Sequence, residues 1–435
     1  MNGIGNSEMD SMQWREFLDM AIGEPPGEVT VRTVRRRMMR RRLTEAAAAS
    51  AVVLVAVGVT AGAAVFGSAG PGGNQAPAGP AVHVKVEAPP KVYVDYVPEQ
   101  KHPRNIYLPI NPATKRAGQP IHVPCAVNCL FEAAPNGKTL YIAAGDSVIP
   151  LDTRTDKPGT PIKVGKDGAE FIKIDPNGKV AYVTGDSQKI TPINLATNTV
   201  GKPFRLITEA GVFAFSADGK TAFVLTPGRN LAENLVPINT VTNTPGTQIS
   251  LGRFDGIALS PDGTTAYLGT KNKITPVSTT NGRQGTSIAL PGNPFEMAIT
   301  PDGKTIVVAI EHGHTTATIT AKVFLISTRT GKVSRPIPIP PAAEEVAFTP
   351  DSKIVYFASS EGPGRGTTPV NITTGTAGKT VHIGAAAQIA MTPDGKTLYA
   401  TNTQGVIPVD VATDTAGPLI PSPARVIIQE IGISP

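Results

Sequence analysis

Short apolar runs alternate with turn signals over the last three quarters of the chain. The tripeptide Pro-Asp-Gly, or a close variant, returns seven times between Pro135 and Gly395, in steps of 41, 41, 44, 40, 49 and 43 residues. Asp or Asn followed by Gly between alternating runs is typical of a β-hairpin, because glycine adopts a positive φ without steric cost. A repeat of about 40 residues indicates an array of supersecondary units.

Each repeat encodes four short strands, a to d. In one repeat, 257–260 and 265–268 flank the turn, 274–278 is a third apolar run, and a Thr/Asn/Gly-rich turn precedes a fourth. Proline recurs in the third run, as at Pro150 and Pro276. Because proline cannot donate to the ladder, we expect the third strand near the edge of its sheet. Four-stranded units repeated around an axis form a β-propeller, so the predicted fold class is all-β.

Fragments of a repeat flank the array. Residues 107–121 form an extra pair of strands c and d, 430–435 resemble a strand a without its turn, and 92–95 could supply strand b. Seven complete repeats and these fragments predict eight blades, of which one is shared by the termini. A seven-bladed propeller is the alternative if a terminal fragment is only an appendage.

Residues 392–402 (TPDGKTLYATN) and 190–202 (ITPINLATNTVGK) closely match the repeat of YVTN-type bacterial β-propellers. The resemblance covers about residues 105–435 and implies the propeller fold and an extracytoplasmic bacterial context, without implying an activity. The WD40 signature is absent, and the single tryptophan, Trp14, lies outside the repeats.

The N-terminal part of the chain predicts a membrane anchor. Residues 46–66 carry no charge and are long enough to cross a bilayer, and seven arginines precede them within residues 32–42. The positive-inside rule then leaves the N-terminus in the cytoplasm. The predicted organisation is a cytoplasmic Arg-rich tail (1–42), a transmembrane signal-anchor (43–66) that contacts membrane lipid, a Gly/Pro/Ala-rich linker (67–90) and the propeller (91–435). Secretion after cleavage near 61–63 is the alternative to a single-pass protein of the bacterial cell membrane.

The formal net charge of +6 does not indicate nucleic acid as a partner. Residues 1–42 account for a net charge of +2, and their arginines lie where anionic lipid headgroups would be. The remaining charges are scattered along the sequence. We therefore predict no nucleic-acid binding.

Cys125 and Cys129 are the two cysteines of the chain. Outside the cytoplasm, an isolated pair at this spacing predicts a local disulfide near the blade where the ring closes.

Catalytic motifs are missing from the sequence: it has no nucleophile elbow, P-loop, zinc-binding helix or dinucleotide fingerprint. A local cluster of Glu311, His312 and His314 could offer ligands to a metal, but two histidines without a third fixed ligand favour an exposed polar loop instead. No cofactor is predicted from these residues.

Acidic residues recur just before strand a, five or six residues before the turn proline. Such a register should bring them to one mouth of the central channel, where a carboxylate ring could bind Ca²⁺. The alternative is that each carboxylate accepts a hydrogen bond from a neighbouring blade. The candidates are Glu170, Asp255, Glu296, Glu345 and Glu430.

The loop between strands b and c is expanded in three repeats, at 226–234, 311–321 and 359–368. All b–c loops of a propeller share one face, and insertions on one face of a repeat protein commonly mark its binding surface. The function predicted is a binding scaffold for a protein or a cell-wall glycan. A hydrolase of the lactonase type, using Glu296, Glu345 and His312 at the channel mouth, and a structural surface protein are the alternatives. The partner-binding candidates are Arg229, Asn230, Glu233, His312, His314, Glu361 and Arg365.

Overall fold

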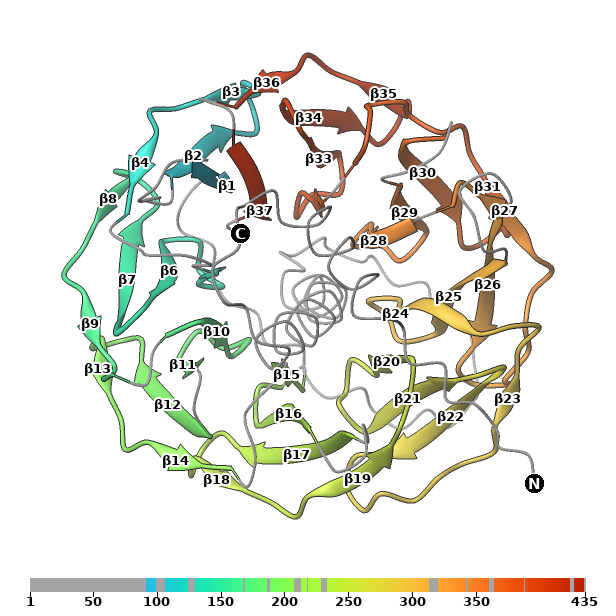
Figure 1. Ribbon diagram of the computed structural model, residues 1–435, viewed down its shortest axis with the longest axis horizontal. Helices are drawn as coiled ribbons and strands as arrows, with labels where there is room; N and C mark the ends of the chain where they lie inside the picture. The colour runs from blue at the N-terminus through green and yellow to red at the C-terminus, as the bar shows by residue number, and fades with distance from the viewer. Residues whose placement is uncertain are drawn as a thin grey trace, which may run out of the picture. The chain divides into compact units, whose positions relative to one another are not determined.

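Eight antiparallel sheets surround a central axis in the computed structural model (Figure 1). The residues that the structure describes are 91–98, 106–123, 130–166, 169–185, 188–206, 213–216, 218–227, 233–312, 320–341, 343–359, 364–386, 388–422 and 426–433. Within them the chain is an all-β, eight-bladed propeller of four-stranded blades, as predicted.

Each blade uses the strand order a-b-c-d, with strand a innermost, and strand d is split into two short segments in five blades. Blade 1 contains β1 (Val92–Pro98), β2 (Ile106–Asn111), β3 (Arg116–Ala117), β4 (Ile121–His122) and β37 (Val426–Ile433). Blade 2 contains β5 (Phe131–Ala133), β6 (Thr139–Ala144), β7 (Ser147–Asp152), β8 (Lys157–Pro158) and β9 (Ile162–Lys163). Blade 3 contains β10 (Phe171–Ile174), β11 (Val180–Thr184), β12 (Lys189–Asn194), β13 (Thr199–Val200) and β14 (Phe204–Arg205). Blade 4 contains β15 (Phe213–Phe215), β16 (Thr221–Pro227), β17 (Glu233–Asn239), β18 (Thr244–Pro245) and β19 (Ile249–Gly252).

The second half of the ring repeats the same arrangement. Blade 5 contains β20 (Gly256–Leu259), β21 (Thr265–Thr270), β22 (Lys273–Ser278) and β23 (Ile288–Ala289). Blade 6 contains β24 (Pro294–Ile299), β25 (Thr305–His312), β26 (Thr320–Ser327) and β27 (Ile337–Ile339). Blade 7 contains β28 (Ala343–Phe348), β29 (Ile354–Ser359), β30 (Gly366–Asn371) and β31 (Thr376–Ala377). Blade 8 contains β32 (Ile389–Met391), β33 (Thr397–Asn402), β34 (Gly405–Asp410), β35 (Thr415–Ala416) and β36 (Ile420–Pro421).

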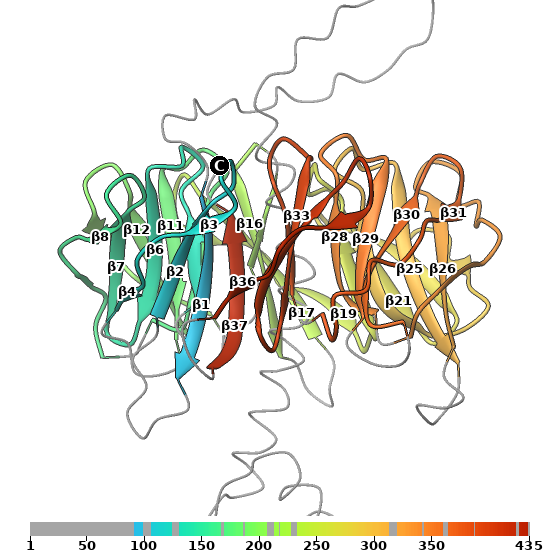
Figure 2. The ribbon, with the colours of Figure 1, turned by 90° about the horizontal axis from the view of Figure 1, so that it is seen from above.

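The first and last strands of the propeller close the ring within blade 1. The C-terminal β37 pairs antiparallel with β1 from Val92↔Ile433 to Pro98↔Val426, with a bulge beside Asp95 (Figure 2). The predicted shared blade is therefore confirmed, and the seven-bladed alternative is wrong. A sheet completed by both ends of a chain must be undone before the ring can open.

The apolar core lies between neighbouring blades, because strand b is buried on both of its faces. Tyr182 on β11 is fully buried and stacks on Phe215 of blade 4, with ring centroids 6.0 Å apart. A larger cluster runs through blades 5 to 7 and includes Ile306 and Val346. Burial on both faces explains why the second runs read as nearly continuous apolar stretches.

The third strand lies next to the outermost strand of its blade, near the edge as its proline predicts, but it is paired on both sides. β7, for example, pairs with β6 on one side and with β8 and β9 on the other. Pro150 lies where strand d is interrupted, so no ladder bond requires its missing N–H. Instead the Pro150 carbonyl accepts a hydrogen bond from Gly159 N at 2.7 Å. Proline is therefore tolerated in an inner strand because its neighbour is split.

Blade 6 shows what replaces the proline. Leu325 occupies the position of Pro150, opposite Val307, and its N–H donates to Ser334 Oγ at 3.0 Å. Ser334 in turn takes the place of the glycine in strand d. The substituted blade thus satisfies the donor that proline removes elsewhere.

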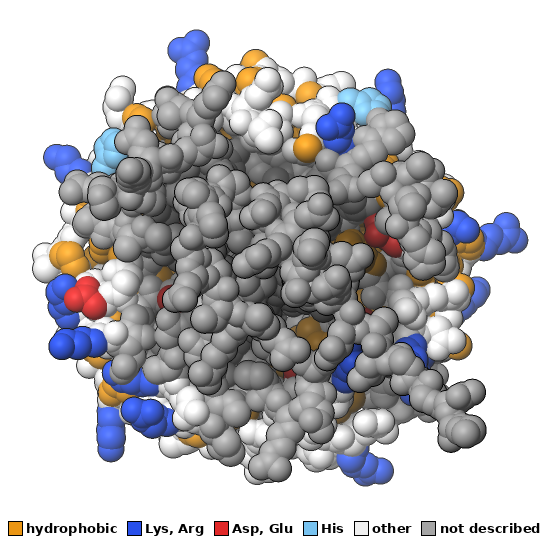
Figure 3. Space-filling view, in the orientation of Figure 1, with side chains coloured by type: hydrophobic (Ala, Val, Ile, Leu, Met, Phe, Trp, Pro, Cys, Tyr) orange, Lys and Arg blue, Asp and Glu red, His pale blue; other side chains and the backbone are white. Residues whose placement is uncertain are grey.

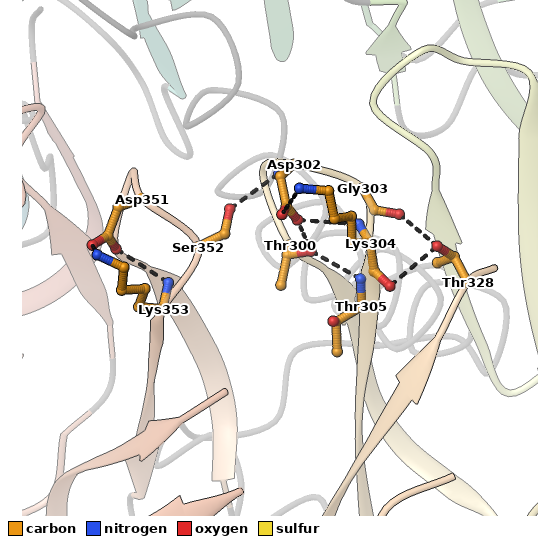
Figure 4. A network of polar contacts seen from close by, with 9 residues as sticks. All are labelled: Thr300, Asp302, Gly303, Lys304, Thr305, Thr328, Asp351, Ser352 and Lys353. Carbon is orange, nitrogen blue, oxygen red and sulfur yellow. Dashed lines mark hydrogen bonds and ion pairs between the residues drawn. The ribbon is translucent and has the colours of Figure 1, made fainter. Parts of the chain in front are cut away.

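The Pro-Asp-Gly turns form a chain of contacts on one face of the ring. Each glycine has a positive φ, such as +71° at Gly303, and a Cβ added there would lie only 3.0 Å from Pro261 Cδ of the preceding blade. In blade 7 Ser352 replaces glycine at φ 60°. Its Oγ accepts a hydrogen bond from Asp302 N of blade 6 at 3.1 Å (Figure 4).

A second set of contacts joins strand b to the next blade's c–d turn. The turn carries a residue in the left-handed region, and where that residue is Asp or Asn, the tyrosine of the preceding blade donates to it. These pairs are Tyr93 with Asp156, Tyr141 with Asn198, Tyr182 with Asn243 and Tyr356 with Asp414. Phe223 and Val307 replace the tyrosine where the next blade has Gly282 or Gly375.

Candidate functional site

The b–c hairpins of blades 4 and 6 extend further than the hairpin of blade 5 between them. The β21–β22 ladder ends at Thr270↔Lys273. In the same register, the β25–β26 ladder continues for two more pairs, to His312↔Thr320. Two pairs lengthen a strand by about 7 Å. Two of the three expanded loops predicted from the sequence therefore begin as longer strands, whereas the β29–β30 ladder of blade 7 ends at Ser359↔Gly366, in the same register as that of blade 5. The face that carries them is uneven.

Glu233 opens β17 on the hairpin of blade 4, opposite Pro227 and Gly252. It is only partly exposed, and burial raises the pKa of its carboxyl above the usual range. Among the partner-binding candidates, Arg365 is exposed beside the b–c loop of blade 7. Arg229, Asn230, His314 and Glu361 lie outside the described residues, and His312 is described only as backbone of β25.

The predicted metal cluster is therefore only partly within the described structure. Glu311 pairs with Ala321 on the β25–β26 hairpin. Among the side chains that the structure describes, no group of three or more His, Cys, Asp or Glu is placed to hold a metal ion.

The candidate channel carboxylates share one end of strand a. Glu296 and Glu345 follow bulges and stand opposite Ala309 and Ala358, and Glu430 follows the bulge opposite Asp95. Glu170 and Asp255 come one residue earlier relative to strand a, directly before β10 and β20. Their N–H groups donate to Thr184 O and Gly269 O, respectively. The spacing to the turn proline is therefore six residues for Glu170 and Asp255 and five for Glu296 and Glu345.

These carboxylates differ in their surroundings. Glu345 is buried, whereas Asp255 is exposed and accepts a hydrogen bond from Lys271 N at 3.1 Å. Glu170 and Glu296 are partly buried. The carboxylates thus share one end of strand a but differ in how exposed they are to solvent.

An ion pair between blades 2 and 3 was missed from the sequence. Lys173 Nζ on β10 lies 2.6 Å from Glu132 Oε2 on β5, and about four fifths or more of each side chain is buried. Blades 4 to 8 have alanine at this position of strand a, as at Ala258 and Ala347. An alignment of the repeats shows this signal in the sequence: Glu132 and Lys173 stand where the later repeats have alanine.

The opposite face carries the Pro-Asp-Gly turns, whose aspartates are engaged within their own blades. Asp302 accepts hydrogen bonds from Thr300 Oγ1 at 2.7 Å and Lys304 N at 3.1 Å, and Lys304 Nζ lies 3.2 Å from it (Figure 4). Partial burial alone would raise the pKa of Asp302, but these hydrogen bonds and the lysine charge together lower it. This face is repetitive and locally neutralised.

A cavity of about 550 Å³ lies on the outer wall between blades 2 and 3. Pro150, Pro161 and Val200 give it an apolar part, and Asp152 and Lys163 give it charge. Lys163 in its lining forms an ion pair with Asp146 of the short b–c loop of blade 2, with Nζ 3.1 Å from Oδ2.

No helix among the described residues is long and apolar enough to span a membrane. The predicted anchor at 43–66, the tail and linker before and after it, and both cysteines lie outside those residues.

Solved structures with similar folds support the architecture. The chain aligns with dihydro-heme d1 dehydrogenase NirN, solved in complex with DHE, with a TM-score of 0.60 and 12% identity, over 78% of this chain and 74% of that one. This likeness shows the propeller fold alone.

Weaker likenesses are found to two other proteins. Hydrazine synthase from Kuenenia stuttgartiensis aligns with a TM-score of 0.46 and 20% identity, over 67% of this chain and 95% of that one. The Cps50 (Swd1) β-propeller domain from Myceliophteria thermophila aligns with a TM-score of 0.46 and 10% identity, over 63% of this chain and 93% of that one. No family model and no curated protein matches the chain. The YVTN-type resemblance therefore stays a prediction from the motifs.

Proposed function

We propose that this protein is a binding scaffold that recognises a protein or cell-envelope partner through the b–c loop face of its propeller. The observation that carries the proposal is the difference between the two faces. One face repeats the same self-neutralised turn, whereas on the other the β25–β26 ladder exceeds its neighbour by two residue pairs. Binding surfaces of repeat proteins concentrate where the repeat is broken.

The expected partner contacts follow from the chemistry of this face. Arg365 offers an exposed guanidinium for carboxylate or phosphate groups. Glu233 is a partly buried carboxyl whose raised pKa suits a hydrogen bond to a polar group of the partner. Arg229, Asn230, His312, His314 and Glu361 complete the proposed surface.

Shortening the blade-6 hairpin tests this function. Residues 313–319 are replaced by a two-residue turn, and proteins retained from a membrane extract are quantified against the intact chain. We expect retained partners to be lost while the unfolding midpoint is unchanged. A control variant, Lys220→Ala/Lys396→Ala, changes the opposite face and should retain them. Equal retention by the shortened chain would refute the b–c face as the binding surface.

We also propose that residues 43–66 anchor the propeller outside a bacterial cell membrane and that Cys125 and Cys129 form a disulfide. The uncharged stretch, the arginines before it and the YVTN-type motifs support this placement. Carbonate extraction of membranes tests the anchor, because a peripheral protein would be released. Alkylation of the intact chain before and after reduction tests the disulfide through the mass added at the two cysteines.

A further inference from the structure

The outer wall of blades 5, 6 and 7 carries positive charge without any acidic residue. Strands c and d and their connections (273–293, 320–341 and 366–386) contain no Asp or Glu. The basic arc is defined here as five exposed residues on this wall: Arg283, Arg329, Lys332, Arg335 and Lys379.

Both ends of the basic arc are bounded by a change of charge. The corresponding segment of blade 4, 233–252, has no Lys or Arg. That of blade 8, 405–422, has none either and carries Asp410 and Asp414. The arc therefore spans three consecutive blades. The segments 106–123 of blade 1 and 188–206 of blade 3 are also basic and free of Asp and Glu, but blade 2 between them carries Asp152 and Asp156.

Neighbouring segments of the arc are in contact with one another. A Cβ placed on Gly331 would lie 3.4 Å from Ile288 Cγ1, so the turn with Arg329 and Lys332 packs on β23 of blade 5. β27 contacts β31 in turn, and the three outer strands follow one another along the periphery (Figure 1). Figure 3 shows basic side chains projecting from the rim of the ring.

Acidic residues do not neutralise the basic arc from within the described part of the chain. The ion pairs found there involve other lysines, such as Lys304 in its turn. Like charges gathered on one surface raise its potential and attract anions from solution. Three of the five residues are arginines, whose planar donors match carboxylate and phosphate oxygens.

We propose that the basic arc binds a linear polyanion, a polymer whose phosphate or carboxylate groups lie on a flexible backbone without bases. The wall is convex, so an extended chain can follow three blades, whereas a flat bilayer would touch only a part of it. Binding of single-stranded nucleic acid depends on aromatic platforms for its bases. The exposed large apolar side chains among the described residues are Val200, Val241, Phe295 and Leu419, and none of them belongs to strands c or d of these blades.

Fluorescence anisotropy tests this proposal with the full chain in neutral-lipid nanodiscs. Labelled polyphosphate and labelled alginate serve as phosphate and carboxylate probes and show which anion the arc prefers. The test variant is Arg329→Glu/Lys332→Glu/Arg335→Glu. The matched control is Lys189→Glu/Lys202→Glu/Arg205→Glu, which makes the same change of charge on blade 3. Poly-dT and phosphatidylglycerol vesicles compete with the bound probe.

We expect the test variant to weaken binding of at least one probe by roughly tenfold or more and to lower the slope of log K against log salt by about two to three. The control should change affinity much less. Equal weakening by both variants would mean that net charge alone attracts the polymer, and the arc would be rejected. Stronger competition by poly-dT or by vesicles than by unlabelled polymer, or no binding of either probe, would also overturn the proposal.

Discussion

The Tyr93 hydroxyl donates a hydrogen bond to Asp156 Oδ1 at 3.0 Å and so joins the closing blade to blade 2. Lys91 Nζ lies 2.8 Å from the other carboxylate oxygen of Asp156. Burial, and then the charge of Asp156, raises the pKa of Tyr93 well above its usual range, so the phenol remains a donor. The contact starts from the sheet in which the first and last strands of the propeller, β1 and β37, pair.

Replacing Tyr93 by Phe should lower the free energy of unfolding by about 1 kcal/mol, because one part-buried hydrogen bond is lost. Asp156→Gly removes the acceptor and keeps the left-handed backbone, since φ there is 57°. Urea unfolding of both single variants and of the double variant gives the coupling energy. We expect about 1 kcal/mol, and strictly additive effects would show that the contact does not stabilise closure. Phe223→Tyr is the control: position 223 faces a turn that carries glycine instead of Asp or Asn, so the added hydroxyl should not raise the free energy of unfolding.

The ion pair of Glu132 and Lys173 should behave as a unit. Removing one partner, as in Lys173→Ala, leaves a mostly buried carboxylate without its cation and should cost about 3 kcal/mol. The double variant Glu132→Ala/Lys173→Ala restores the alanines of the other blades and should be close to neutral. Thermal unfolding of the three variants separates these outcomes. A double variant as unstable as Lys173→Ala would contradict the interpretation.

Variants at Gly303 and Ser352 test why the third position of the Pro-Asp-Gly turn favours glycine. Gly303→Ala should destabilise the protein by about 1–2 kcal/mol from the left-handed backbone, with an added cost because the new Cβ would crowd Pro261. Ser352→Gly relieves the backbone but loses the bond from Asp302 N, so its net effect should stay within about 1 kcal/mol of zero. Urea midpoints measure both. If Ser352→Gly destabilised the protein as strongly as Gly303→Ala, the hydrogen bond from Asp302 N to Ser352 would contribute more than the relief of backbone strain at this position, which would contradict the expectation.

The turn aspartates should make the propeller sensitive to acid. Asp262, Asp302 and Asp351 have pKa values below the usual range: burial opposes the shift, but hydroxyl and backbone hydrogen bonds outweigh it. A lowered folded-state pKa gives stability above the unfolded-state pKa, which is lost as pH falls through the folded value. The free energy of unfolding should therefore decrease as the pH is lowered below about 4. The triple Asp→Asn variant should show a shallower drop, and an unchanged pH profile would exclude these groups as its cause.

Most of the fold could be predicted from the sequence because it depends on local patterns. The turn residues, the apolar runs and the terminal fragments fix the strand order and the blade that contains Val92 and Ile433. The split of strand d around Pro150 was not predicted, because it depends on pairing between segments and not on the proline itself.

The candidate site was less accessible from the sequence. Register placed the acidic residues at one end of strand a, but the burial of Glu345 beside the exposure of Asp255 depends on packing against other blades. The basic arc was missed for a related reason: Arg283 and Lys379 are far apart in sequence and are brought to one wall by the ring.

Site-specific photo-crosslinking in intact cells tests the central claim most directly. A photoreactive residue is placed at Arg365 or Lys271 on the b–c loop face, and at Lys220 or Lys396 on the face of the turns. The binding-scaffold function predicts a discrete crosslinked product from the b–c positions and none from the turn positions. A product from the turn positions alone, or no product from any position, would contradict it.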